Sequence, residues 1–334
     1  MKAYITRISY CLPDTVEENE SGRLTRKTGI QRRHICPPDR TAGDMAAEAA
    51  EKLFAQAPSE RENVAFLLLC TQSPDYPLPT TACILQDRLG LRKSCGALDF
   101  NLGCSGFIYG LGLAKGLIES EQAKSVLLLT SETYSKYIHA QDGATRPLFG
   151  DGASAALLTG IETPQDGIYG LVYGTDGSGA GELIVPIGGM RHRYQDTEVE
   201  KTEDKYGNAR TNQNLYMNGS NIMNFALDVV PPALEEVLSK AMLTRKDIDG
   251  YVFHQANRVV LDFLQEKCGL MDADFWNDVA EYGNTVSSSI PIALVDRMRR
   301  NPEAGQKRVL LMGFGVGLSW GGCVVDLSRV KGAD

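Results

Sequence analysis

The stretch Gly96-Ala97-Leu98-Asp99-Phe100-Asn101-Leu102-Gly103-Cys104-Ser105-Gly106 joins two structural patterns. Its first part, 96–101, is typical of a β-strand, and the glycines around Cys104 permit a sharp turn. An apolar helical face then follows, made of Phe107, Ile108, Leu111 and Leu117. A strand that turns directly into a helix is a connection typical of layered α/β folds. The pattern therefore predicts a helix over 104–120 with Cys104 at its start.

A cysteine at the start of a helix is a candidate nucleophile. Free backbone N–H groups and the positive end of the helix dipole stabilise a thiolate there, which predicts a lowered thiol pKa for Cys104. Two alternatives remain open from this context alone. Cys104 is a buried structural residue in the first, and Ser105 is the nucleophile in the second, although the GxSxG spacing of hydrolases is absent.

The same alternation of strands and helices continues along the chain. Before residue 163 it predicts strands at 3–9, 64–70, 125–130 and 153–158, and helices at 42–56, capped by Thr41, and at 80–89. After residue 163 it predicts strands at 168–174, 249–254, 308–314 and 319–327, and helical segments at 214–243, 256–267 and 285–300. We therefore expect two similar halves, 1–162 and 163–334, with 175–213 as a surface loop.

Composition limits the possible partners. The chain has 334 residues, is 43% hydrophobic and carries a formal charge of −8, which gives no overall attraction to nucleic acid or anionic membranes. Its longest apolar runs, such as 64–70, are too short to cross a bilayer. The segment 1–6 lacks the pattern of a secretory signal, so we expect a mature cytoplasmic protein that starts at Met1.

Cysteine usage agrees with a reducing compartment. The eight cysteines are scattered and form no CxxC pair, so we expect neither a structural metal site nor a disulfide framework. Cys70, Cys83 and Cys323 are expected to act as small buried hydrophobic residues.

Two further polar residues follow predicted strands or precede predicted helices. His254 alone among the four histidines directly follows a strand, and the strand ends of α/β sheets present side chains to a crevice. Asn284 precedes the predicted helix 285–300. Taken singly, His254 fits a structural role and Asn284 fits an N-cap or a turn. Taken with Cys104, they supply a partner for a thiol and donors for a developing oxyanion.

Six motifs along the chain make this combination specific. They are Thr28-Gly29-Ile30-Gln31-Arg32-Arg33-His34, Gly103-Cys104-Ser105-Gly106-Phe107, Leu148-Phe149-Gly150-Asp151-Gly152-Ala153, His254-Gln255-Ala256-Asn257, Gly283-Asn284-Thr285 and Gly313-Phe314-Gly315-Val316-Gly317-Leu318-Ser319-Trp320-Gly321. In this order they resemble the 3-oxoacyl-(acyl carrier protein) synthase III family over nearly the whole chain. The resemblance implies a thiolase-like α/β fold, with two duplicated halves in a five-layer αβαβα architecture, and a homodimer.

The resemblance also implies roles for individual residues. Cys104, His254 and Asn284 would be catalytic, and the backbone N–H groups of Cys104 and Val316 would form an oxyanion hole. Phe314 would shield the site, and Asn257 would contact the substrate. The glycine loop 313–317 lacks the GxGxxG spacing and precedes a predicted strand, which disfavours a dinucleotide site.

The implied reaction has two steps. Cys104 takes an acyl group from acyl-CoA or an acyl carrier protein, and malonyl-ACP or malonyl-CoA then loses CO2 to give the attacking carbanion. His254 and Asn284 would stabilise the enolate oxygen, without a metal or redox cofactor. Two other functions remain open, namely acyl transfer by Cys104 to an amine or hydroxyl without condensation, and an inactive partner subunit that kept the fold.

Some positions depart from the best-known members, which clamp the adenine of coenzyme A between a Trp and an Arg. Arg23 and Lys27 occupy those places here, and Gly143 replaces an expected Arg, although Arg146 lies nearby in the sequence. A carrier-protein-bound acyl donor is therefore an alternative to coenzyme A.

Two further expectations concern the primer chain and the carrier protein. Leu78 occupies a gating position, contributed across the dimer, where Phe is common, and a smaller gate would admit longer or branched acyl chains. Docking of an acidic acyl carrier protein requires a basic patch, for which the candidates are Arg191, Arg193 and Arg258. The alternative is that these are ordinary solvated arginines.

Overall fold

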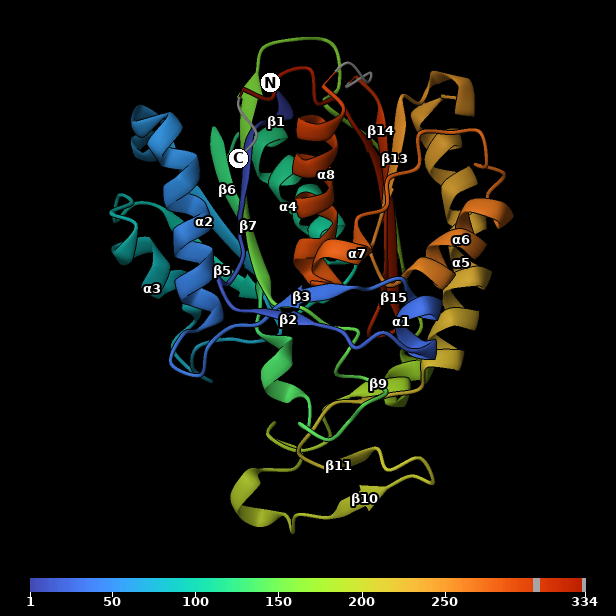
Figure 1. The fold of residues 1–334 in the computed structure, drawn as a ribbon. Helices are drawn as coiled ribbons and strands as arrows, with labels where there is room; N and C mark the ends of the chain where they lie inside the picture. Colours follow the sequence, from blue (N-terminus) through green and yellow to red (C-terminus); the bar gives the residue numbers. More distant parts are fainter. Residues whose placement is uncertain (303–306, 332–334) are drawn as a thin grey trace.

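Two mixed β-sheets run side by side through the molecule, which is a computed structural model describing residues 1–302 and 307–331 (Figure 1). The first sheet has the order β1-β7-β6-β4-β5, from β1 (Lys2–Cys11), β4 (Phe66–Cys70), β5 (Gly96–Phe100), β6 (Ser125–Glu132) and β7 (Gly152–Ile161). The second has the order β13-β14-β15-β8, from β8 (Ile168–Thr175), β13 (Gly250–Phe253), β14 (Val309–Gly315) and β15 (Ser319–Val325).

The two sheets repeat one pattern of strand directions. In the first sheet β1 and β6 are each antiparallel to β7, and the pairs β6–β4 and β4–β5 are parallel. In the second, β8 and β14 are each antiparallel to β15, and β14–β13 is parallel. A parallel bridge between Tyr251 and Phe275 lies at the place of a fifth strand. This repetition matches the expected duplication.

Helices form three layers around the sheets (Figure 1). α2 (Ala42–Gln56) and α3 (Thr81–Arg88) pack on the outer face of the first sheet. α4 (Gly106–Glu119) and α8 (Ser289–Arg300) lie between the sheets. α5 (Gly219–Ala241) and α6 (Arg258–Lys267) cover the outer face of the second sheet. The predicted five-layer α/β architecture is confirmed.

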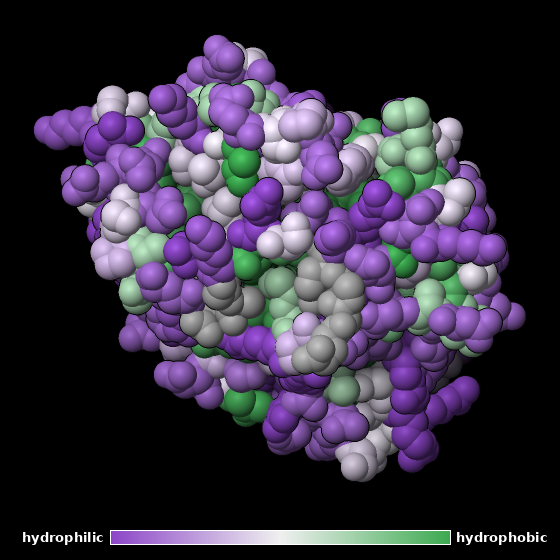
Figure 2. All heavy atoms as spheres, turned by 90° about the horizontal axis from the view of Figure 1, so that it is seen from above, coloured by the Kyte–Doolittle hydropathy of each residue, from purple (hydrophilic) through white to green (hydrophobic). Residues whose placement is uncertain are grey.

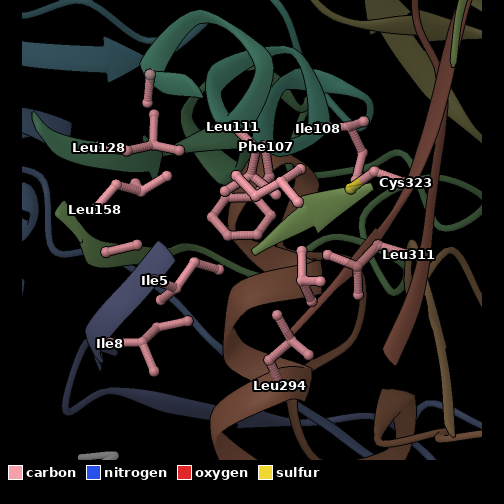
Figure 3. Packing of buried hydrophobic residues seen from close by; sticks show 14 of the residues in the cluster. Ile5, Ile8, Phe107, Ile108, Leu111, Leu128, Leu158, Leu294, Leu311 and Cys323 are labelled. Carbon is pink, nitrogen blue, oxygen red and sulfur yellow. The ribbon is translucent and has the colours of Figure 1, made fainter. Parts of the chain in front are cut away.

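The central layer is held by apolar side chains from both sheets, which converge on α4 and α8 (Figure 3). Phe107 and Leu111 of α4 are fully buried among Leu128 from the first sheet and Leu311 from the second. Burying one such side chain contributes about 1.5–3 kcal/mol. Because α4 is packed on both sides, the turn that carries Cys104 is held between the two sheets.

The boundaries of three predicted helices show what local sequence can decide. α2 begins at Ala42 as predicted, because Thr41 and Asp44 form a capping box. α4 begins at Gly106, so Cys104 lies in the preceding turn and not in the helix. α5 begins at Gly219, and not at 214, because Tyr216–Met217 form strand β12.

Several short elements were not predicted. The interval 175–213, expected to be irregular surface loop, contains β9 (Leu183–Ile184), β10 (Lys201–Glu203) and β11 (Ala209–Thr211), and β12 pairs with β9. β2 (Val16–Glu18), β3 (Arg32–His34), α1 (Arg23–Thr28) and α7 (Val279–Tyr282) were also missed. Short 3₁₀ helices span Pro58–Asn63, Tyr134–Tyr137, Gly177–Glu182, Tyr194–Asp196, Arg245–Asp247 and Val286–Ser288. Elements this short do not develop a readable hydrophobic period.

The surface seen from above in Figure 2 is mostly hydrophilic, with scattered apolar side chains. Within residues 1–302 and 307–331, no helix is both long enough and apolar enough to traverse a bilayer. Cys70 and Cys323 are buried as predicted, whereas Cys83 is exposed and corrects that expectation.

Candidate active site

A buried cavity of about 100 Å³ brings together the three residues expected to be catalytic. Cys104 precedes α4, His254 follows β13, and Asn284 lies in the segment that leads to α8. Each is at most 7% exposed, and all three line the same cavity. Residues far apart in the chain thus meet between the two sheets.

Cys104 lies in a tight turn, closed by a hydrogen bond of 2.8 Å from the Gly106 N–H to the Gly103 carbonyl. The last residue of β14 passes directly over the thiol, because a Cβ placed on Gly315 would be 2.8 Å from Sγ of Cys104. Only glycine permits this close approach without displacing the thiol.

The resting thiol is protonated. Burial raises the pKa of Cys104 to about 12, helped by the charge of Glu132, while the backbone N–H groups of Val316 and Cys104 act in the opposite direction. The predicted lowering of this pKa is therefore wrong. The helix begins only at Gly106, and the loss of solvation outweighs the few donors near the sulfur.

The same two backbone N–H groups are those expected to form the oxyanion hole. Both favour the thiolate form of Cys104, because each lowers the thiol pKa. Ser105 points elsewhere: its Oγ lies 2.8 Å from Oγ of Ser319, whose hydroxyl donates to the Val316 carbonyl. This arrangement disfavours Ser105 as the nucleophile and holds the loop that carries Val316.

His254 is a neutral, oriented ring. Burial lowers its pKa to about 3. Its Nδ1 lies 2.7 Å from Oγ of Ser289, and that oxygen also accepts a bond of 3.4 Å from the Gln255 N–H. A Ser289 hydroxyl that donates to Nδ1 leaves the ring hydrogen on Nε2. Phe314 packs edge-on against the ring, with 5.4 Å between centroids.

Asn284 is held on three sides. Its backbone N–H donates to Leu148 and its carbonyl accepts from Gly150, while its side-chain Oδ1 accepts a bond of 2.9 Å from the Val286 N–H. Val286 has a φ of 54°, a left-handed conformation that is rare for a β-branched residue. Such strain is typical of functional turns. The amide is thereby oriented with its nitrogen as the remaining donor.

Three residues near the site were not predicted. Tyr134 lines the cavity, Ser289 orients His254, and Glu132 is buried within reach of Cys104. Tyr134 and Glu132 stand at the carboxyl end of β6, so the strand-end rule that singled out His254 could have found them. Ser289 carries no such signal, because its role depends on the packing of α8 against β13.

The substrate-binding predictions divide into two groups. Asn257 and Phe314 line the cavity, and Oδ1 of Asn257 caps α6 by accepting from Val260. Leu78 is 79% exposed and lies outside this cavity. Arg23 and Lys27 are exposed on α1, which packs against α6.

The three arginines considered for carrier docking lie on the surface in two separate parts of the fold. Arg193 pairs with Asp196, which compensates part of its charge, and Arg191 is exposed in the same segment. Arg258 begins α6 and donates to the Arg26 carbonyl on α1. In the described parts of the chain, His, Cys, Asp and Glu side chains form no group of three or more suited to a metal ion.

Comparison with known proteins identifies the family. Two family models match, 3-oxoacyl-[acyl-carrier-protein] synthase III over residues 98–177 and the C-terminal part of the same enzyme over residues 238–327. A β-ketoacyl-[acyl-carrier-protein] synthase III of Caldanaerobacter subterraneus subsp. tengcongensis is 35% identical, over 92% of this chain and 89% of the relative.

Solved structures agree over the whole length. A crystal structure of a 3-oxoacyl-(acyl-carrier-protein) synthase III superposes with a TM-score of 0.94 and 46% identity, covering 98% of this chain and 100% of the other. A 3-oxoacyl-(acyl-carrier protein) synthase from Burkholderia xenovorans gives a TM-score of 0.91 and 32% identity, covering 100% of this chain and 96% of the other. The chain therefore belongs to the 3-oxoacyl-[acyl-carrier-protein] synthase III family.

Proposed function

We propose that this chain is a β-ketoacyl-[acyl-carrier-protein] synthase III-type acyltransferase that condenses a Cys104-bound acyl group with a malonyl thioester. The observation that carries the proposal is the meeting of Cys104, His254 and Asn284 in one buried cavity. The remaining donors of His254 and Asn284 are oriented by neighbouring groups, as catalysis by preorganised dipoles requires.

In the first step the Cys104 sulfur attacks the acyl thioester carbonyl. A bond forms from Sγ to the acyl carbon, the bond to the carrier sulfur breaks, and the thiol proton is transferred to the departing carrier thiolate, which leaves as a thiol. The N–H groups of Cys104 and Val316 stabilise the tetrahedral oxyanion. Because the resting thiol is protonated, attack and proton transfer must be coupled.

In the second step a malonyl thioester loses CO2, and the electron pair of the broken bond moves into an enolate. Nε2–H of His254 and the amide of Asn284 donate to the enolate oxygen. A neutral imidazole suits this role. Because the pKa of His254 is low, no imidazolium is present that could protonate the carbanion. The carbanion then attacks the acyl carbon, and Cys104 leaves as a thiolate.

Several parts of the proposal concern partners. An acyl carrier protein supplies the malonyl group, with Arg191, Arg193 and Arg258 as docking candidates. Arg23 and Lys27 contact the phosphates or adenine when coenzyme A is the carrier. Their exposed positions on α1, next to α6 where Asn257 lines the cavity, support this role.

The proposed homodimer pairs the β5 edges of two copies. β5 is the edge strand of its sheet, and a nearby surface hollow is lined by Phe100, Leu113 and Tyr173, the last two well exposed. Exposed apolar side chains next to an unpaired edge strand favour self-association. Leu78, on an exposed loop, would then reach the site of the other copy.

We also propose the boundary between the duplicated halves at residues 162 and 163, which separates β7 from β8 and leaves one repeated strand pattern on each side. A cytoplasmic location is proposed as well, and eight free cysteines fit a reducing compartment.

The proposal is tested by intact-protein mass after incubation with a panel of acyl thioesters, followed by addition of malonyl-ACP and product analysis. An acyl adduct on Cys104 that is consumed with release of CO2 supports condensation. An adduct that transfers only to amines or hydroxyls indicates the non-condensing alternative. A chain that acquires no adduct would be the inactive partner subunit.

A further inference from the structure

A second cavity, of about 530 Å³, adjoins the first, because Tyr134 and Leu183 line both. Val316, which belongs to the proposed oxyanion hole, also lines the second cavity. Cys104, His254 and Asn284 line only the first cavity, so the second cavity adjoins the site on the side of Tyr134, Leu183 and Val316. An acyl group held on Cys104 has this space available to it.

One wall of the second cavity is a row of polar side chains across the end of the first sheet. Tyr134, Gln72 and Asn101 follow the carboxyl ends of β6, β4 and β5, which are adjacent parallel strands. The Tyr134 hydroxyl donates to Oε1 of Gln72 at 2.5 Å, and Nε2 of Gln72 donates to Oδ1 of Asn101 at 3.1 Å. The strand order thus creates a hydrogen-bonded chain of three residues.

Gln72 is at the centre of this row and is held before any substrate arrives. Its backbone N–H donates to the Glu132 carboxylate at 3.0 Å, and its carbonyl accepts from the Tyr137 hydroxyl at 2.7 Å. With its main chain and its amide both bonded, the side chain has little freedom to turn away. A fixed polar group discriminates between ligands better than a mobile one, since no ordering cost offsets its contacts.

The Gln72 amide lies next to the nucleophile. A Cβ placed on Gly103, the residue before Cys104, would be 2.6 Å from Oε1 of Gln72 and 2.6 Å from a methyl group of Val316. Tyr134 packs in the same apolar cluster as Cys104. The first carbons of an acyl chain on Cys104 would therefore pass along this amide.

The amide keeps unused hydrogen-bonding capacity. A glutamine side chain has two N–H donors and two acceptor lone pairs, and the bonds to Tyr134 and Asn101 use one of each. One donor and one acceptor remain. A hydroxyl group matches such a pair, because it donates and accepts at once, whereas a methylene group leaves both unpaired.

The second cavity also has apolar side chains in its wall, among them Ile184, Ile187 and Leu215. The cavity thus combines the polar row of Tyr134, Gln72 and Asn101 with an apolar wall. A straight saturated chain would match only the apolar wall, and a group with polar atoms throughout would match only the polar row.

The geometry points to an acyl group that carries a hydroxyl on its second or third carbon, followed by an apolar chain, as the preferred primer. This inference rests on the proposed acylation of Cys104, and it assigns Gln72 as the residue that determines specificity. It differs from the expectation based on Leu78, which concerned only the size and branching of the chain.

The test compares matched acyl thioesters that differ by one hydroxyl: butanoyl with 2- and 3-hydroxybutanoyl, and hexanoyl with 3-hydroxyhexanoyl. The rate of acyl-Cys104 formation is followed by intact mass in a Cys83→Ser background, which removes the exposed thiol. We expect a hydroxylated thioester to react about tenfold faster than its unsubstituted counterpart. This factor corresponds to the free energy of roughly one hydrogen bond.

Substitution of the amide should remove this preference. Gln72→Leu is expected to slow the hydroxylated donors about tenfold and to spare the unsubstituted ones. Because Gln72→Leu leaves the Tyr134 hydroxyl without its acceptor, the double variant Gln72→Leu/Tyr134→Phe repeats the test without that unpaired hydroxyl, and the exposed Asn101, which also loses its partner, can bond water instead. Gln122→Leu is the matched control, since Gln122 is exposed beyond the far end of α4 and its side-chain amide donates to the exposed Ser120 hydroxyl.

Each outcome decides a separate question. Equal or faster loading of the unsubstituted chains in the parent protein overturns the inference and leaves the proposed function standing. A hydroxyl preference that persists in both Gln72 variants also overturns it, because the amide would not be the discriminating group. Failure of every donor to load Cys104 counts against the proposed function itself.

Discussion

The turns that lead into the two central helices provide hydrogen-bond donors by different means. The turn before α4 carries the thiol, and the donors that favour its thiolate are backbone N–H groups of Cys104 and Val316. The segment before α8 provides side chains: Asn284 is oriented by Val286, and Ser289 orients His254. Backbone donors survive side-chain substitution, whereas side-chain donors do not. The two half-reactions should therefore be separable by mutation of the second segment alone.

Removal of the thiol should have the largest effect. Cys104→Ala is expected to abolish covalent acylation with every donor, because no other described thiol lines either cavity. The measurement is intact mass, with Cys83→Ser as the control that keeps full loading. A stoichiometric adduct on Cys104→Ala would show that the first turn does not carry the nucleophile.

Loss of the side-chain donor in the second segment should separate the steps. Asn284→Ala is expected to slow condensation by about 100 to 1,000-fold, the usual cost of one oxyanion donor, while acyl-Cys104 still forms. Single-turnover acylation and steady-state product formation are measured on the same preparation. Equal losses in both steps would mean that Asn284 does not act on the enolate, and acyl transfer without condensation would become the better interpretation.

The pH dependence of stability tests how deeply His254 is buried. Its folded-state pKa of about 3 lies below the usual value near 6.5, so between these limits the unfolded chain binds a proton that the folded chain does not. Stability contributed by the neutral ring is present above pH 6.5 and is lost as the pH falls. The parent protein should lose about 1.4 kcal/mol per pH unit more than His254→Asn between pH 6 and 4.

Denaturant unfolding at a series of pH values measures this difference. Parallel stability profiles for the parent protein and His254→Asn would show that the ring titrates normally in the folded state. The assignment of neutral His254 as a donor in the second half-reaction would then lose its support.

The smallest effect is expected at the surface. The double variant Arg23→Ala/Lys27→Ala should raise KM for coenzyme A thioesters a few-fold, as loss of exposed charge contacts does, and leave kcat unchanged. Arg92→Ala/Lys93→Ala is the matched control, because this pair is exposed on the turn after α3. Identical KM values in both double variants would remove Arg23 and Lys27 from the carrier site.

Prediction from the sequence succeeded where local rules are strong. Thr41 with Asp44 set the start of α2, and long apolar runs located β4, β6 and β14 within two residues. It failed for β2 and β10, of three residues each, which are too short to show a period. It also failed for α5, where β12 pairs with β9 and displaces the expected helix start.

The sequence by itself determined the α/β class, the resemblance to the family and the identity of Cys104, His254 and Asn284 as candidates, because these depend on residue order. Only the tertiary structure decided their protonation. Burial between two sheets raises the thiol pKa and lowers that of the imidazole, and no local motif encodes solvation. It also decided that Gln72, Asn101 and Tyr134 form one polar wall, since that contact follows from the order of β6, β4 and β5 in the sheet.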